Sequence, residues 1–121
     1  YHARVSSPKM LASNPLFGAL FESALVQELH KQVAAGGIAA AWYHWRSAGG
    51  AEVDLLLEKD DTLFPFEFKL TTQPSRRSAS GIAAFKSAYP GRNIGKGAVI
   101  CAVEKPYWIT EDVMAIPWNI L

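Results

Sequence analysis

The order of helix and strand patterns predicts an α/β domain in which a mixed central sheet is flanked by helices. Two helical stretches, near residues 14–35 and 75–89, enclose three strand-like runs, and a further apolar strand-like run follows the second helix. The chain has 121 residues, and 50% of them are hydrophobic, which is enough for one core. We therefore expect an irregular segment at residues 1–13 and a single domain at residues 14–121.

The composition excludes several classes of protein. The single cysteine, Cys101, lies in the apolar run 98–103, so a disulfide framework is excluded and a reducing compartment is expected. No stretch approaches the roughly 18 apolar residues of a membrane span, and no signal peptide is visible. We expect a soluble, cytoplasmic protein with no membrane partner. Because the chain begins with Tyr1 and not with Met, we expect it to be a piece of a longer protein.

The first helix is expected to begin at Asn14 and Pro15, which suit the cap and the first helical position, and to end near Ala35, before Gly36–Gly37. Its apolar stripe should pack on the sheet and consists of Phe17, Leu20, Phe21, Ala24 and Leu25. Glu28 continues this stripe and Glu22 lies on its flank. A buried, unpaired carboxylate is costly, so either residue is a candidate for a site, but a long Glu side chain also reaches solvent easily.

Residues 51–70 have the pattern of a β-hairpin, with two apolar runs on either side of a polar turn at residues 59–62. Centring the turn on Asp60 and Asp61 pairs residue 56 with 65 and places Asp54 opposite Glu67. Alternation predicts one core face, formed by Val53, Leu55, Leu57, Phe66, Phe68 and Leu70, with Phe64 beside it. The opposite face is expected to carry Glu52, Asp54, Leu56, Glu67 and Lys69.

Two carboxylates that face each other across a sheet repel, so something must offset Asp54 against Glu67. A divalent cation with oxygen ligands would do so, and Lys69 would add a positive charge or serve in catalysis. A simpler interpretation remains open, because mixed charges are common on solvated strands. Glu52 and Lys69 would then form an ordinary exposed ion pair.

Residues 38–46 are rich in aromatic side chains and are predicted to form a strand. We expect Trp42, Tyr43 and Trp45 to lie in the core rather than to stack on bases. His44 has no partner at a metal-binding spacing and is expected to be structural.

Charge is unevenly distributed, although the net charge is only +1. Residues 52–67 carry six acids and one base, whereas residues 68–103 carry six bases and no acid. Arg76 and Arg77 begin the second predicted helix, where basic groups oppose the helix dipole, so they and Lys86 are candidates for nucleic-acid contact. Residues 98–103 resemble a buried strand, and residues 107–110 and 113–118 are expected to form an edge strand and a closing segment.

The order of these elements, with Asp54 on one strand and Glu67-Phe68-Lys69 on the next, resembles the PD-(D/E)XK nuclease-like superfamily. Gly18 to Glu22 is similar to the helix motif of its archaeal Holliday-junction resolvase branch. Three segments are similar to the uncharacterised domain that ends many prokaryotic AAA-type ATPases, namely residues 16–29, 52–58 and 65–69. This resemblance covers about Leu16 to Trp118.

The resemblance implies a restriction-endonuclease-like αβββαβ core and metal-dependent hydrolysis of phosphodiesters in DNA. It implies that Mg²⁺ or Mn²⁺ is bound by Asp54, Glu67 and the carbonyl of Phe68, with Glu22 acting directly or through water. Glu28 is a weaker candidate ligand. Lys69 would orient or activate the attacking water, so that Lys69, Glu67, Asp54 and Glu22 form the catalytic set.

An N-terminal ATPase module is the partner that the resemblance implies in a longer chain. The alternative function is a catalytically silent module of the same fold that binds DNA or serves that ATPase. A stand-alone structural domain is a third interpretation.

Overall fold

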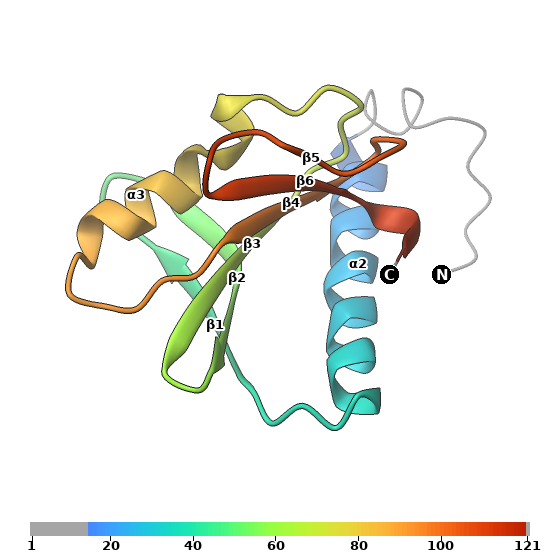
Figure 1. Ribbon diagram of the computed structural model, residues 1–121. Coiled ribbons are helices and arrows are strands. Elements are labelled where there is room, and N and C mark those ends of the chain that lie inside the picture. The colour runs from blue at the N-terminus through green and yellow to red at the C-terminus, as the bar shows by residue number, and fades with distance from the viewer. Residues whose placement is uncertain (1–14, 121) are drawn as a thin grey trace.

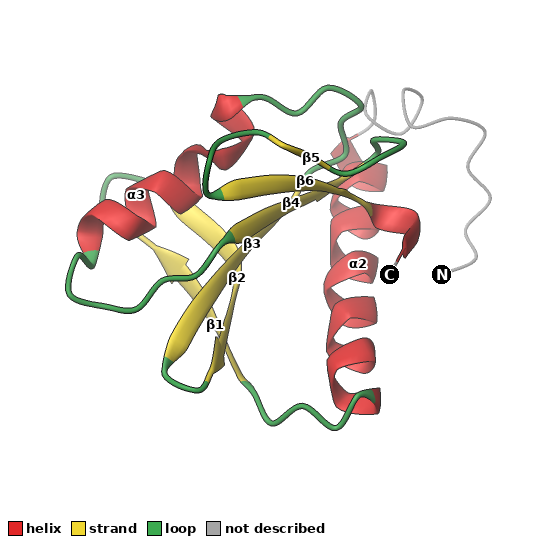
Figure 2. Cartoon of the chain, in the orientation of Figure 1, coloured by secondary structure: helices red, strands yellow, loops and turns green. Residues whose placement is uncertain are grey.

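The computed structural model of the protein describes residues 15–120. Figure 1 shows the arrangement of the chain, and Figure 2 separates its helices, strands and loops. In chain order the elements are α2 (Pro15–Ala35), β1 (Ala41–Arg46), β2 (Glu52–Lys59), β3 (Thr62–Phe68), η1 (Arg76–Ala79), α3 (Ser80–Ala88), β4 (Gly97–Cys101), β5 (Tyr107–Trp108), β6 (Val113–Pro117) and η2 (Trp118–Ile120).

The described strands form a six-stranded sheet in the order β1-β2-β3-β4-β6-β5. β3, β4 and β6 run parallel to one another, whereas β1, β2 and β5 each pair antiparallel to their neighbours. The prediction of a mixed sheet in an α/β fold is therefore confirmed. β5 is an edge strand as expected, but β6 is inserted between β4 and β5 and is more than a closing segment.

Within the described residues, α2 and α3 cover opposite faces of the sheet (Figure 1). On one face, Phe21 and Leu25 of α2 pack with Leu55, Phe68 and Ile100. On the other face, a second cluster joins α3 to the sheet and includes Val53, Leu56, Ile82, Phe85 and Val99. Because both faces are covered, every residue of β4 is buried.

The predicted stripe of α2 is partly wrong. The positions that are buried against the sheet are Phe21, Leu25 and Leu29, at a spacing of four residues, whereas Leu20 is 54% exposed. The prediction counted residues at both three- and four-residue spacings, which made the predicted apolar stripe too wide. The buried residues of this helix form a single row at a spacing of four. The predicted cap Asn14 and the side chain of Phe17 lie outside the described part.

The hairpin formed by β2 and β3 has the predicted register from its turn to Leu55 and Phe66, but the predicted pairing of Asp54 with Glu67 does not form. Leu56 pairs with Pro65, and Lys59 pairs with Thr62 across the turn. Asp60 and Asp61 form this two-residue turn with φ angles of 52° and 62°. Two successive residues in the left-handed region characterise a type I′ turn, whose twist matches that of a hairpin.

The predicted faces of β2 are wrong at its first half, because a β-bulge interrupts the alternation. On β1, only His44 separates the paired residues Tyr43 and Trp45, whereas Asp54 and Leu55 separate their partners on β2. Two residues of β2 thus oppose one residue of β1. Leu55 keeps the predicted face beside α2, but Val53 lies in the α3 cluster instead.

The second predicted helix begins as a 3-10 turn, η1, and continues as α3. The backbone N–H of Ser75 donates to Ser78 Oγ over 3.1 Å, as half of a capping box at the start of η1. This cap fixes the turn that carries Arg76 and Arg77.

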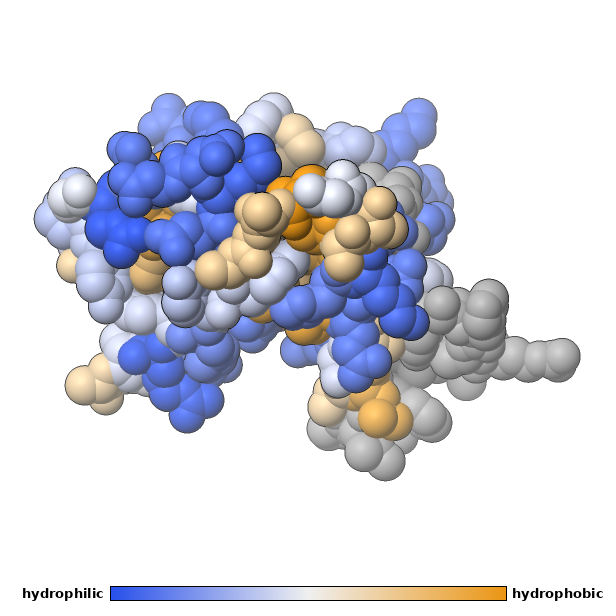
Figure 3. Space-filling view, turned by 90° about the horizontal axis from the view of Figure 1, so that it is seen from below, coloured by the Kyte–Doolittle hydropathy of each residue, from blue (hydrophilic) through white to orange (hydrophobic). Residues whose placement is uncertain are grey.

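The face of the molecule seen in Figure 3 is a mosaic of mostly hydrophilic residues with small, separated apolar patches. None of the helices in residues 15–120 has the length and apolar character that crossing a membrane requires.

Candidate metal centre

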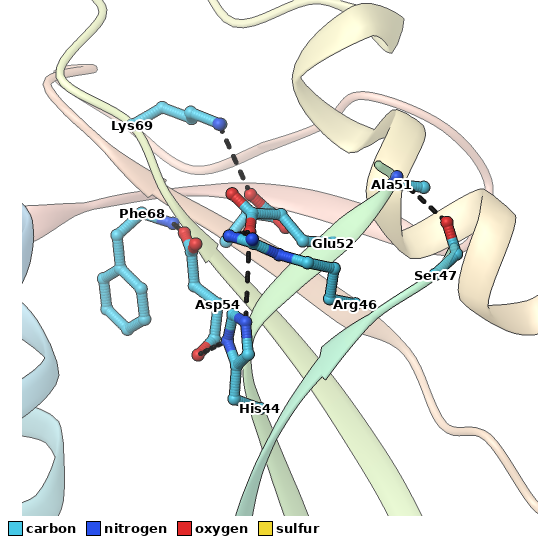
Figure 4. A network of polar contacts seen from close by, with 9 residues as sticks. His44, Arg46, Ser47, Ala51, Glu52, Asp54, Phe68 and Lys69 are labelled. Atoms are coloured by element: carbon cyan, nitrogen blue, oxygen red, sulfur yellow. Dashed lines mark hydrogen bonds and ion pairs between the residues drawn. The ribbon is translucent and has the colours of Figure 1, made fainter. Parts of the chain in front are cut away.

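The candidate site lies where β2 and β3 separate. Their pairing runs from the turn to Leu55 and Phe66, after which β2 continues beside β1 and β3 continues beside β4. Beyond that point the backbone N–H of Phe68 donates to Asp54 Oδ2 at 2.9 Å (Figure 4). The bulge supplies Asp54 at this position, and its carboxylate bridges the two diverging strands.

Glu67 is the buried acid of the site. It is only 2% exposed, and its Oε1 has no hydrogen-bond partner among the described residues. Burial, and then the charge of Asp54, raises the pKa of Glu67 from 4.5 to about 8, although Lys69 and the backbone of Asp54 oppose the shift. A buried acceptor without a donor is costly, so this oxygen favours a proton or a cation beside it.

Lys69 lies at the mouth of the site, with its Nζ 3.5 Å from Glu67 Oε2. Burial alone lowers the pKa of Lys69, but the carboxylates of Glu67, Asp54 and Glu22 outweigh burial, and the pKa is raised. Glu67 contributes to the raised pKa of Lys69 only when Glu67 is ionised. Without a bound cation, this requires a pH above about 8.

Glu22 joins the site from α2, on the other side of the sheet from α3. Burial raises the pKa of Glu22, the charge of Asp54 raises it further, and Lys69 opposes both. The structure thus brings together the four residues of the predicted catalytic set. Glu28 is not among them, since its Oε1 accepts a hydrogen bond from Gln32, one turn further along α2.

Three polar residues on β1 and β2 adjoin the site. Arg46 donates to Glu52 at 2.9 Å, and His44 Nε2 lies 3.9 Å from the same Glu52 oxygen (Figure 4). His44 Nδ1 also lies 3.4 Å from the carbonyl oxygen of Asp54, within the bulge. The suggested ion pair of Glu52 with Lys69 is therefore replaced by Glu52 with Arg46 and Lys69 with Glu67.

The contacts of His44 and Arg46 with Glu52 and Asp54 were not predicted from the sequence. His44 reaches Asp54 and Glu52 because it is the residue opposite the bulge, and the bulge is not visible in the alternation pattern. The alternation of His44 and Arg46 on β1 and of Glu52 and Asp54 on β2 was the available signal, and it also fits a solvated strand.

A pocket of about 180 Å³ opens beside Glu67 and Lys69. Its other polar lining residues come from β2 and from the start of the η1–α3 segment, and are Glu52, Arg77, Ser78 and Ser80. Arg77 is thus brought to the site. Arg76 and Lys86 line a separate pocket of about 150 Å³, where Lys86 Nζ lies 3.0 Å from Asp112 Oδ2.

Gly81 allows α3 to lie close to the site. A Cβ atom on Gly81 would collide with the backbone carbonyl oxygen of Glu52 and would approach Glu67 Oε1 to 3.2 Å. Backbone atoms cannot move aside as a flexible side chain can. Glycine at this position therefore sets the distance between the helix and β2, and with it the size of the pocket.

The donor atoms fit a small divalent cation that prefers oxygen. Asp54 and Glu67 supply carboxylates, and the carbonyl of Phe68 points to the same side of β3 as the N–H that bonds Asp54, as it does for any residue in an extended strand. Mg²⁺ is commonly held by one or two carboxylates and completes its shell with water or phosphate. Within residues 15–120, no three His, Cys, Asp or Glu side chains form a group that could hold a metal ion, so water or substrate would have to supply the remaining ligands.

The fold and the site define an α/β domain with an acidic cluster and one lysine at a point of strand divergence. Comparison with known families shows that residues 17–121 match the "Domain of unknown function (DUF4143)", and the chain belongs to this family. The uncharacterized proteins Rv2008c of Mycobacterium tuberculosis and Mb2031c of Mycobacterium bovis are 27% identical to it over 107 residues. These residues are 88% of this chain but only 22% of each relative. No solved structure matches the chain.

Proposed function

We propose that this domain is a metal-dependent nuclease of the PD-(D/E)XK type, with a restriction-endonuclease-like core, that hydrolyses phosphodiester bonds in DNA. The observation that carries the proposal is the buried, unpartnered Oε1 of Glu67 beside Asp54 and Lys69. A site that only stabilised the fold would gain by pairing this oxygen, because unsatisfied buried acceptors cost free energy.

Each residue has a defined task in the proposed reaction. Asp54, Glu67 and the Phe68 carbonyl would hold Mg²⁺ or Mn²⁺, with Glu22 acting through water from α2. The cation, when bound, would neutralise charge that develops on the phosphate. Lys69 would hold the attacking water in line with the phosphorus atom and balance the charge of the reacting group, which is catalysis by positioning and electrostatics.

Arg77 is a suitable contact for the phosphate next to the scissile bond. It lines the same pocket as Lys69, and among the described residues neither Arg76 nor Arg77 has a carboxylate partner. An unpaired guanidinium group beside an open pocket is well suited to bind a phosphate group. Lys86 is less suited, because Asp112 already neutralises it.

The proposal is tested by cleavage and metal binding measured side by side. We expect wild-type protein with Mg²⁺ or Mn²⁺ to cleave branched, single-stranded or duplex DNA. Asp54→Asn and Glu67→Gln should abolish cleavage and also Mn²⁺ binding in a calorimetric titration. Lys69→Met should slow cleavage by about 100-fold or more while the metal still binds. Glu104→Gln, at an exposed position, serves as the matched control.

Cleavage that survives both Asp54→Asn and Glu67→Gln would show that the site is wrongly assigned. A wild-type protein that neither cleaves nor binds Mn²⁺ would favour the alternative, a catalytically silent module of the same fold. The observation in favour of this alternative is that, within residues 15–120, no three acidic, His or Cys side chains form a group that could hold a metal ion. An AAA-type ATPase module in the cytoplasm is the partner that we propose for either function.

A further inference from the structure

A second, larger pocket lies on the same side of the sheet as the pocket beside Glu67 and Lys69, at the opposite end of α3. Its volume is about 340 Å³, within the range of pockets that bind small molecules. β1 and β2 form its floor, and the end of α3 and the loop after it form its wall. Nothing in the proposed reaction uses this pocket.

Aromatic rings dominate the wall of the pocket. Trp45 packs edge-on against Phe85 with ring centroids 5.3 Å apart, and Phe85 lies 5.1 Å from Tyr89. Two rings of the pocket remain open to solvent, since Tyr43 is 49% exposed and Tyr89 is 42% exposed, so the prediction that Tyr43 lies in the core is wrong. Exposed ring faces beside a concave surface provide places on which a planar ligand can stack.

One end of the pocket carries hydrogen-bonding groups of both kinds. Glu58 accepts hydrogen bonds from the hydroxyl of Tyr43 at 3.1 Å and from Arg92 at 3.2 Å. A carboxylate has about four acceptor positions and a guanidinium group has five donors, so both groups retain capacity for a ligand. A nucleobase, which has ring faces and carries donors and acceptors on its edge, complements this combination.

His44 connects this pocket to the candidate metal centre. It lines the aromatic pocket, and its Nε2 lies 3.9 Å from Glu52, which lines the pocket beside Glu67 and Lys69. His44 therefore lies between the aromatic pocket and the pocket beside Glu67 and Lys69.

We propose that this aromatic pocket binds the base of an unpaired nucleotide, so that the substrate of the domain is single-stranded or locally unpaired. The choice of a polynucleotide as the source of the base rests on the proposed function. A base within a duplex is stacked on both sides and could not enter, whereas an unpaired base exposes both of its faces.

The experiment measures binding without catalysis. Fluorescence anisotropy of a labelled single-stranded oligonucleotide is followed in the presence of EDTA, with unlabelled single strand, duplex and free mononucleotide as competitors. Tyr43→Ala and Tyr89→Ala should each weaken single-strand binding by roughly 5- to 150-fold, the loss expected from one base–aromatic stack. Tyr107→Ala is the matched control, since Tyr107 is 44% exposed on the opposite edge of the sheet.

Competition by the mononucleotide would mean that the pocket recognises a free base. Competition by the single strand alone would mean that binding requires a polynucleotide chain. Both outcomes support the proposal that the pocket binds an unpaired base. Binding that is unchanged by both tyrosine variants, duplex that competes as well as single strand, or wild-type protein that binds no single strand would each overturn it. Because cleavage is measured separately, tyrosine-dependent binding without cleavage would refute only the nuclease. Cleavage with tyrosine-independent binding would refute only the pocket.

Discussion

Replacing Glu67 by Gln should remove most of the pH dependence of the stability of this domain. The pKa of Glu67 is raised from 4.5 to about 8 in the folded protein, chiefly by burial and by the charge of Asp54. Below about pH 4.5 the carboxyl group is protonated in both the folded and the unfolded chain. Between the two values the unfolded chain releases the proton and the folded chain retains it, so the free energy of unfolding falls as the pH rises.

The size of this effect follows from the difference between the two pKa values. Each unit is worth about 1.36 kcal/mol, so a rise from 4.5 to about 8 corresponds to a loss of roughly 5 kcal/mol at most. That amount is comparable to the whole stability of many small domains. Above about pH 8 the group is ionised in both states, and its contribution stops changing.

Urea denaturation from about pH 5 to about pH 9 in the presence of EDTA would measure this slope. The wild-type protein should lose stability across this range, whereas Glu67→Gln should lose far less, with Glu104→Gln as the matched exposed control. Adding Mg²⁺ at high pH should stabilise the wild type but not Glu67→Gln, because a cation that binds only the folded protein adds to its stability. Equal slopes for wild type and Glu67→Gln would refute the reasoning about Glu67.

Two further predictions concern the backbone. Gly81→Ala should lower the free energy of unfolding by about 1–3 kcal/mol, because the new Cβ would meet the carbonyl of Glu52. Gly91→Ala is the control and should change little, because a Cβ there has open space. Equal urea midpoints for the two variants would contradict the close approach of α3 to β2. Asp61→Gly should raise the free energy of unfolding by roughly 0.5–1 kcal/mol, and the melting temperature with it, because Asp61 has a φ of 62° that glycine adopts without strain. An unchanged or lower melting temperature would argue against the type I′ turn.

The hairpin shows what the sequence is able to determine. A polar turn between two apolar runs predicted the pairing of Leu56 with Pro65, and the structure has that pairing. Turn and pattern are both local, so neighbouring residues carry all the information that is needed. The same holds for α2, where Gly36–Gly37 follow a helix that ends at Ala35.

Other features depend on residues far apart in the chain. Lys86 pairs with Asp112, and β6 lies in the sheet between β4 and β5. Neither arrangement can be predicted from the local sequence pattern. The prediction of the sheet face on which Val53 lies was wrong for a similar reason. Its position follows from a bulge that is formed against β1, and a strand read alone appears regular.

The bulge that breaks the prediction for Val53 is also what builds the candidate site. It adds one residue to β2 opposite His44, which turns Asp54 towards Phe68 at the point where β2 and β3 part. A regular strand would have continued the ladder, and the Phe68 N–H would then face a backbone carbonyl instead of the carboxylate of Asp54. The sequence predicted that Asp54 and Glu67 lie together, but for a partly wrong geometric reason, since they meet through the divergence of two strands rather than on one flat face.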